Sequence, residues 1–417
     1  MTTYLRSILC VLTLLFISHA PAAVIDREGS GFLELKDSSY ILHLKGSPYE
    51  RGYQHGRLLK TMIQRNISTF IDKKQTAVDE RTQKFIENLP TLMKYIPSHF
   101  LEEMKGVSDG SGIAMDKILL LNLFPEMFHC SGMTLSGPAT KDHQLYHVRV
   151  LDYSIGKNLQ DTAVLMAVEP QNGHSYLNVS YAGFIGSITG MNKEKIAIGE
   201  IGGLGYGYWD GIPMAFLLRE ILEKAGSLEE AKQILASSPR TCEYYYVISD
   251  GKTNEGIGVY ATASQLRFIL PGSSYALLAP SDLPENYGAK GEHDKFLLTA
   301  CCIENTPHQT LLFQDDKNLA LLFRQQPTDC VLLTGFSTPA RYPVMTDRIL
   351  QNWGKIDQKT LIEVIKTPVA LPTNLHNAIF LPAELKVWIS HAGPNNEPAC
   401  NQPYVEFSLL ELFAPSS

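Results

Sequence analysis

Short apolar and alternating segments recur along the chain after residue 130. They are rich in β-branched residues or alternate between apolar and polar positions, and turns with Gly, Asn and Lys separate them. A period of two is typical of strands that bury one face. The predicted strands are 131–136, 144–151, 163–169, 174–180, 195–199, 244–249, 256–260, 266–270, 377–381, 386–390 and 404–408.

Helical patterns precede and interrupt these strands. Residues 48–128 place apolar side chains at helical spacing after Pro48, with a glycine-serine break expected at Gly106–Gly112. Ser227 and Glu230 form a capping box at the start of a later helix. Besides the helix that begins at Pro48, the predicted helices are 79–95, 98–106, 115–124, 213–225, 228–236, 343–353 and 358–366. Two antiparallel sheets with helices outside them, a layered α+β sandwich, fit this order, with the first hundred or so residues as a helical appendage.

The N-terminus has the pattern of a signal peptide. Arg6 precedes an apolar core at 8–17, and Ala20-Pro21-Ala22 suits a cleavage site after residue 22. The apolar run is too short for a stable membrane anchor. We therefore expect an extracytoplasmic protein, secreted or periplasmic, or lysosomal and secretory in a eukaryote.

Net charge, cysteine content and the motifs that are absent bear on the expected partners, disulfides and cofactors. A net charge of −7 on 417 residues gives no basic footprint, so no nucleic acid is expected as a partner. Six of the seven cysteines follow the signal peptide, and disulfides are open to Cys242, Cys301, Cys302, Cys330 and Cys400. No spacing is typical of a metal site, and no phosphate loop is present, so we expect no cofactor and no metal. Two glycosylation patterns, at Asn66 and Asn178, are interpreted as chance matches.

Cys130 lies where the helical pattern changes to the strand pattern. If the bond between His129 and Cys130 is cut, Cys130 gains a free α-amino group beside its own thiol. Nucleophile and base then come from one residue, and an α-amino pKa of about 7.7–8.0 suits a general base. Cys130 is therefore the candidate nucleophile; the alternative is a small buried apolar residue.

Arg149 and Asp152 follow the candidate nucleophile by 19 and 22 residues. Asp152 could orient the α-ammonium group, and Arg149 could lower the pKa of the thiol. Their opposite parity places them on opposite faces of an unbroken strand, so the strand must end or bulge near Leu151. The alternative is an ion pair at a strand end. Arg341 opens a predicted helix and opposes its dipole, which indicates a carboxylate or an oxyanion as its partner.

Residues 183–207 are rich in glycine without matching a dinucleotide or phosphate motif. Such glycines let backbone amides approach a ligand, and Met191 and Trp209 either line an acyl pocket or pack in the core. A conventional Cys–His pair would draw on one of several histidines that no spacing distinguishes: His129, His143, His147, His376 and His391.

The chain resembles the N-terminal-nucleophile hydrolases, in the branch of isopenicillin N acyltransferase, choloylglycine hydrolases, penicillin V acylase and acid ceramidase. The resemblance extends from about residue 46 to about residue 390. The residues that carry it are Gly46–Gly56, Cys130-Ser131, Arg149–Tyr153, Gly183–Asn192, Gly211–Pro213, Arg219, Tyr244–Gly251, Arg341 and Asn374–His376.

This resemblance implies a four-layer αββα sandwich that is made as a precursor. The implied parts are a signal peptide at 1–22, a small chain at 23–129 and a large chain at 130–417. Cys130 is the implied nucleophile, with Arg149, Asp152 and Arg341 as site residues. Choloylglycine hydrolases place an Asn in the oxyanion hole, whereas 275–281 contain none, and a second oxyanion position falls near Gly202. Either other groups, such as Asn192 or Asn286, supply the oxyanion hole, or the substrate differs from those of the well-known members.

The preferred hypothesis is a self-processing amidohydrolase or acyltransferase. It cleaves or transfers the acyl group of a small, linear N-acyl amide through a thioester on Cys130. The two chains stay associated, and a homo-oligomer is left open. The alternatives are a conventional cysteine peptidase with a Cys–His pair and a non-catalytic ligand-binding protein on the same fold.

Overall fold

The computed structural model describes most of the chain. The described residues are 23–72, 80–123, 129–202, 208–272, 299–300, 309–312, 320–323, 328–334 and 341–414. The predicted signal peptide, Cys301, Cys302, 275–281 and Asn286 lie outside them.

Ten strands form a first sheet. Its order is β1-β2-β3-β6-β7-β8-β9-β10-β11-β12, and β3 with β6 is its one parallel pair among the described strands. The strands are β1 (Ala23–Glu28), β2 (Gly31–Lys36), β3 (Ser39–Gly46), β6 (Ala163–Pro170), β7 (Tyr176–Tyr181), β8 (Thr189–Asn192), β9 (Ile196–Gly202), β10 (Glu243–Asp250), β11 (Glu255–Thr262) and β12 (Leu266–Ile269).

A second sheet of seven strands has the order β13-β16-β4-β5-β17-β18-β19, antiparallel throughout. Its strands are β4 (His129–Leu135), β5 (Tyr146–Asp152), β13 (Thr299–Ala300), β16 (Cys330–Thr334), β17 (Asn374–Leu381), β18 (Lys386–His391) and β19 (Val405–Ser408). Between the two sheets, the described residues form one ladder pair, His129 of β4 with Gly202 of β9. A separate hairpin consists of β14 (Gln309–Leu312) and β15 (Ala320–Phe323).

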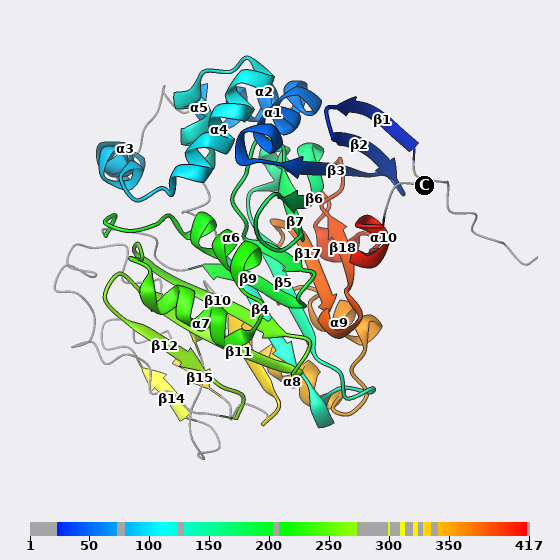
Figure 1. The fold of residues 1–417 in the computed structure, drawn as a ribbon. Coiled ribbons are helices and arrows are strands. Elements are labelled where there is room, and N and C mark those ends of the chain that lie inside the picture. The colour runs from blue at the N-terminus through cyan, green and yellow to red at the C-terminus, as the bar shows by residue number, and fades with distance from the viewer. Residues whose placement is uncertain are drawn as a thin grey trace, which may run out of the picture.

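The buried clusters define four layers. One cluster lies between the sheets and joins residues such as Leu165 and Leu177 of the first to Phe380 and Val387 of the second. The outer face of the second sheet packs on α8 (Arg341–Gln351) and α9 (Gln358–Val364). The outer face of the first sheet packs on α6 (Met214–Lys224), α7 (Leu228–Ser237) and the N-terminal helices. A short helix, α10 (Leu409–Leu412), follows β19. The predicted α+β fold is therefore confirmed, and the sheets and helices form an αββα sandwich (Figure 1).

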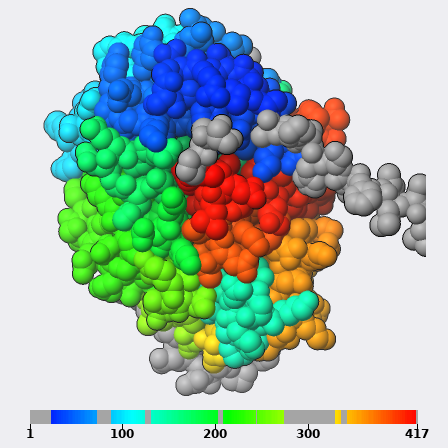
Figure 2. All heavy atoms as spheres, turned by 45° about the vertical axis from the view of Figure 1, so that its right-hand side comes forward, coloured from blue at the N-terminus to red at the C-terminus, as the bar shows by residue number. Residues whose placement is uncertain are grey.

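The N-terminal part, residues 23–129, is called the leader here. Its helices are α1 (Pro48–Leu58), α2 (Lys60–Asn66), α3 (Glu80–Met93), α4 (Ser98–Ser111) and α5 (Met115–Leu123), with a π-helical turn at Ile67–Asp72. The prediction of a purely helical leader is wrong, because β1, β2 and β3 precede α1 and extend the first sheet. The leader is thus built into the sandwich, and Figure 2 shows it (blue) packed directly on later parts of the chain.

The predicted break at Gly106–Gly112 is wrong in one respect. Helix α4 continues through Gly106 and Gly110 and ends at Gly112, whose φ of 72° is left-handed. The internal glycines serve close packing on α1: a Cβ at Gly106 would lie 2.3 Å from the Tyr49 carbonyl oxygen, and one at Gly52 only 1.9 Å from the Glu103 carbonyl oxygen. No side chain would fit between the helices at these positions.

Candidate active site

Cys130 is fully buried at the start of β4. It follows His129, which forms with Gly202 the one ladder pair between the two sheets in the described part of the chain. The predicted change from helix to strand at this residue agrees with α5 before it and β4 after it. In the intact chain the thiol donates a hydrogen bond to Oε2 of Glu200, at 3.7 Å. Cys130 therefore lies in the interior of the sandwich and faces the first sheet.

Arg149 and Asp152 lie on opposite faces of β5, as their parity predicts. Arg149 points between the sheets, where its Nη2 donates to Oε2 of Glu200 at 3.0 Å. Asp152 is the last residue of β5 and pairs with Arg341 on the helical side. The strand ends where expected, and the bulge lies in the neighbouring strand β17, between Asn374 and His376. Both side chains act electrostatically on Cys130, because the cysteine lies opposite Leu151 at the strand end.

Glu200 is a site residue that the sequence analysis missed. It lies in β9, a strand that is buried along its whole length, and its side chain is inaccessible. Burial raises the pKa of Glu200 to about 7, against the opposing effects of Arg149 and of the Gly202 backbone amide. A charged residue inside the otherwise apolar segment Ile196–Gly202 was the available signal, since buried carboxylates are rare unless paired.

The thiol of Cys130 is not activated in the intact chain. Burial raises its pKa well above the usual range, although Arg149 acts in the opposite direction. Arg149 thus lowers the pKa of the Cys130 thiol, as predicted, but desolvation raises that pKa by more. Arg149 keeps its Nε and Nη1 without a hydrogen-bond partner among the described residues, so two buried donor groups remain beside the nucleophile.

Arg341 anchors the other side of the site. As expected for a cation at the start of a helix, it has a carboxylate partner: Nη2 contacts Oδ2 of Asp152 and also donates to Oγ of Ser131 at 2.6 Å. Oδ1 of Asp152 accepts the backbone N–H of Leu371 at 2.9 Å. Burial raises the pKa of Asp152, and Arg341 opposes that rise. The pair thereby fixes the strand end next to Cys130.

Of the two residues predicted to contribute to the oxyanion hole, Gly202 lies at the site and Asn192 does not. Gly202, with a φ of 100°, is the ladder partner of His129 and therefore lies at the site. Asn192 does not: its amide group donates to the carbonyls of Leu222 and Ala225 at 3.0 and 2.8 Å, and its oxygen accepts the N–H of Ile196. Its amide group is thus engaged in closing a β-hairpin against α6, and we withdraw it as an oxyanion donor. Asn286 lies outside the described residues.

The histidines do not form a Cys–His pair among the described side chains. His376 has both ring nitrogens engaged, with the Tyr181 hydroxyl at 2.8 Å and the Thr189 hydroxyl at 3.0 Å. His147 bonds to the Ser249 hydroxyl at 2.8 Å. The side chain of His129 lies outside the described part. The geometry thus gives no support to a conventional cysteine peptidase.

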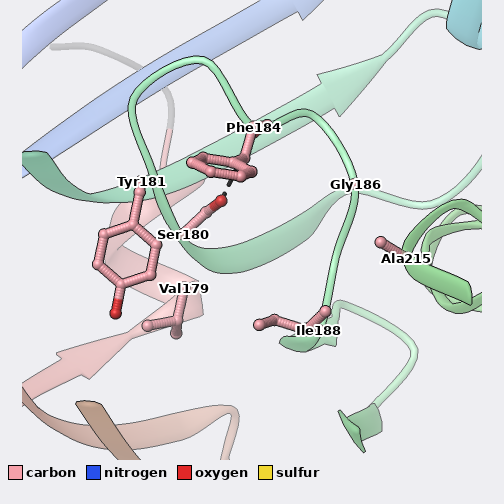
Figure 3. Close-up of a pocket in the computed structure, with 7 residues that line it drawn as sticks. All are labelled: Val179, Ser180, Tyr181, Phe184, Gly186, Ile188 and Ala215. Atoms are coloured by element: carbon pink, nitrogen blue, oxygen red, sulfur yellow. Dashed lines mark hydrogen bonds between the residues drawn. The ribbon is translucent and has the colours of Figure 1, made fainter. Parts of the chain in front are cut away.

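An apolar pocket lies at the end of β7 (Figure 3). Its cavity measures about 20 Å³, which is room for about one water molecule. The Tyr181 hydroxyl bonds to His376, which lies opposite Leu151 in the second sheet, and Leu151 in turn lies opposite Cys130, so this wall of the pocket is close to Cys130. The lining residues are Val179, Ser180, Tyr181, Phe184, Gly186, Ile188 and Ala215. Met191 and Trp209 do not line it; both pack in the core.

The described residues bear on the predictions about disulfides, glycosylation, metal ions and membrane anchoring. Cys130, Cys330 and Cys400 are free and buried, and Cys242 is also buried. Asn66 and Asn178 are also buried, with their amides bonded to backbone carbonyls, so neither can carry a glycan in the fold. In the described ranges, no group of three or more His, Cys, Asp or Glu could hold a metal ion. No helix in the described part is long and apolar enough to cross a membrane.

Sequence comparison shows which known proteins this chain is similar to. Residues 139–270 match the family model of acyl-coenzyme A:6-aminopenicillanic acid acyl-transferase. Acid ceramidase of Homo sapiens is 26% identical over 253 residues, which cover 52% of this chain and 61% of that protein. This chain is a relative of the N-terminal-nucleophile hydrolases.

Two further comparisons cover more of the chain. Protein dcd1B of Dictyostelium discoideum is 26% identical over 418 residues, which cover 90% of this chain and 75% of that protein. A solved structure of the Caenorhabditis elegans N-acylethanolamine-hydrolyzing acid amidase ortholog aligns with a TM-score of 0.41 and 15% identity, covering 67% of this chain and 99% of that one. The chain spans less than two thirds of the length of acid ceramidase.

Proposed function

We propose that the chain is a self-processing cysteine amidohydrolase or acyltransferase that acts on small, linear N-acyl amides. The observation that carries the proposal is the position of Cys130 between two buried ion pairs. Arg149 with Glu200 lies on one side, and Asp152 with Arg341 lies on the other. Relatives named as an acyltransferase and a ceramidase support this reaction class.

The first reaction is the cut before Cys130. The thiol transfers its proton to Glu200, whose pKa of about 7 suits a base at neutral pH. The sulfur attacks the carbonyl carbon of His129, the C–N bond to Cys130 breaks, and the nitrogen takes up a proton to become the α-amino group. Water then hydrolyses the thioester, which leaves a carboxylate on His129 and regenerates the thiol.

In the mature protein the new α-amino group replaces Glu200 as the base. The amine takes the thiol proton while the sulfur attacks the carbonyl carbon of the substrate amide, and it returns a proton to the leaving amine. Asp152 lies within electrostatic range of Cys130 and orients the ammonium form. The free N–H groups of Arg149 donate to the oxyanion in place of the missing Asn. Water or an acceptor amine then releases the acyl group from the sulfur.

The proposal includes the surroundings of the enzyme. A signal peptide at 1–22 directs it out of the cytoplasm to a secreted, periplasmic or lysosomal location, without a stable membrane anchor. Chains 23–129 and 130–417 remain associated, because the leader supplies β1–β3 to the first sheet. No cofactor takes part.

The test is N-terminal sequencing of the purified protein, together with a denaturing gel. Wild-type protein should give two chains, the larger beginning at Cys130, and should hydrolyse N-acyl amides with no added metal. Cys130→Ala should remain one chain and be inactive. Cys242→Ala is the matched control, because it removes another buried thiol that lies outside the site. Full amidase activity in an uncut wild-type chain would exclude the mechanism.

A further inference from the structure

The loop after β7, residues 182–187, forms part of the apolar pocket through Phe184 and Gly186. It makes only three backbone-to-backbone hydrogen bonds through its own N–H groups, from Ala182, Phe184 and Ser187. Buried backbone groups left without partners are costly, so side chains must satisfy the others.

Three buried side chains of the leader provide those partners. Asn66 of α2 donates to the Ala182 carbonyl at 2.8 Å. His55 of α1 accepts the N–H of Gly183 at 2.9 Å. Asn122 of α5 bridges the loop: it donates to the Gly183 carbonyl at 2.8 Å and accepts the N–H of Ile185 at 2.7 Å. These three side chains are at most 1% exposed. Together they are called the leader clamp.

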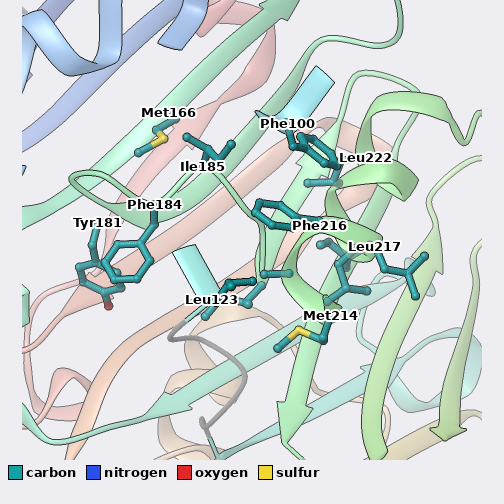
Figure 4. Packing of buried hydrophobic residues seen from close by; sticks show 14 of the residues in the cluster. Phe100, Leu123, Met166, Tyr181, Phe184, Ile185, Met214, Phe216, Leu217 and Leu222 are labelled. Atoms are coloured by element: carbon teal, nitrogen blue, oxygen red, sulfur yellow. The ribbon is translucent and has the colours of Figure 1, made fainter. Parts of the chain in front are cut away.

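A charged network ties the end of the loop to the leader as well. Arg219 of α6 donates to the Ile185 carbonyl at 2.6 Å and pairs with Glu103 of α4. Figure 4 shows Phe100 of the leader in the same packed cluster as Ile185 and Phe216. The leader therefore fixes the loop by polar contacts and by packing.

We propose that the leader clamp sets the size of the acyl group that the enzyme accepts. With room for about one water molecule, the pocket has no space for an extended acyl chain, and the longer the chain, the farther the loop must move outward to admit it. The clamp opposes that movement because it would break hydrogen bonds to buried backbone groups. His55, Asn66 and Asn122 are thus positioning residues for acyl selectivity, which rests on the proposed amidase function.

The experiment compares fluorogenic N-acyl-aminocoumarin amides from acetyl to lauroyl on the processed full-length enzyme. Asn122→Leu removes both bonds to the loop, and we expect the ratio of kcat/KM for lauroyl to that for butyryl to rise about tenfold. Asn66→Ala, which removes one bond to the loop, should give a smaller rise and remains informative if Asn122→Leu does not fold.

Ser111→Ala is the matched control. Ser111 is a buried polar residue of the leader whose hydroxyl bonds only to nearby backbone groups of the leader: it donates to the carbonyls of Val107 and Ser108 and accepts the N–H of Ile113. The ratio should stay as in wild type. If Asn122→Leu and Asn66→Ala lower kcat/KM for all chain lengths by one factor, as a general loss of structure does, the clamp does not set selectivity.

A binding measurement separates this inference from the chemistry. Cis-parinaric acid, a fluorescent fatty acid, is titrated into Cys130→Ala with and without Asn122→Leu. The second substitution should tighten binding about tenfold. If the wild-type enzyme hydrolyses no amide but the second substitution still tightens fatty-acid binding, the proposed reaction is wrong and the role of the leader clamp is supported. Unchanged affinity would overturn the clamp whatever the enzyme catalyses.

Discussion

Replacing Glu200 by Gln isolates the pH dependence that this buried carboxyl imposes on folding. Burial raises its pKa from the ordinary 4.5 to about 7. Between these pH values the folded protein holds a proton that the unfolded chain has released. The resulting stabilisation is fully present below pH 4.5 and is lost as the pH rises through about 7.

The size of this effect follows from the two pKa values. The rise from 4.5 to about 7, at about 1.4 kcal/mol per pH unit, gives about 3 kcal/mol of unfolding free energy. His55, His147 and His391 act with the opposite sign, because burial lowers their pKa values to about 4, about 3 and about 4. These histidines are present in both proteins, so the difference between wild type and Glu200→Gln retains the glutamate contribution alone.

The assay is urea unfolding from about pH 4 to about pH 8, with both proteins carrying Cys130→Ala so that each stays one chain. We expect the stability of the protein that retains Glu200, relative to the Glu200→Gln variant, to fall by about 3 kcal/mol across this range. Replacing the carboxyl group by an amide also changes the local hydrogen bonding, which adds an offset that does not change with pH. Two parallel stability curves would mean that Glu200 is ionised throughout, held by Arg149, and would refute the reasoning.

Two further predictions concern the ion pair and the helix contact. Asp152→Asn leaves Arg341 without its carboxylate, so self-cleavage should slow by at least about tenfold and unfolding free energy should fall by about 3–5 kcal/mol, measured by gel time course and urea unfolding; normal cleavage would remove Asp152 from the site. Gly106→Ala should destabilise the protein by about 1–3 kcal/mol in thermal unfolding because α1 and α4 must separate, whereas Gly156→Ala, with no atom within 4 Å of its Cβ, should not; equal effects would contradict the close packing.

Much of the fold could be read from periodicity, because most strands and helices bury one face or one stripe. The short strand β8 (Thr189–Asn192) was missed, since a four-residue segment between glycines has too little pattern to detect. Among the leader strands, β1 was missed for a different reason: it lies largely exposed, and hydrophobic alternation is absent there. Gly106 and Gly110 were interpreted as a break because local propensity disfavours glycine in helices, whereas tertiary packing on α1 requires it.

The candidate site was predicted in part. Cys130, Arg149, Asp152 and Arg341 come together because strand parity and helix polarity constrain where their side chains point. Glu200 could not be assigned from spacing, since its proximity to Cys130 depends on how the two sheets stack. For Asn192, the sequence showed an amide near glycines, and only the structure shows that its hydrogen bonds close a hairpin.

The pairing of β3 with β6 has a consequence for the life of the mature protein. The leader provides the three strands at one edge of the first sheet, and the proposed cut before Cys130 would remove the covalent link that guides these strands into place during folding. Folding is unimolecular for the uncut precursor but bimolecular for two separate fragments. Refolding of the fragments therefore slows with dilution, whereas refolding of the precursor does not. A cleaved protein that unfolds at low concentration would therefore have no efficient route back to the folded state, and the rate of unfolding would set its lifetime.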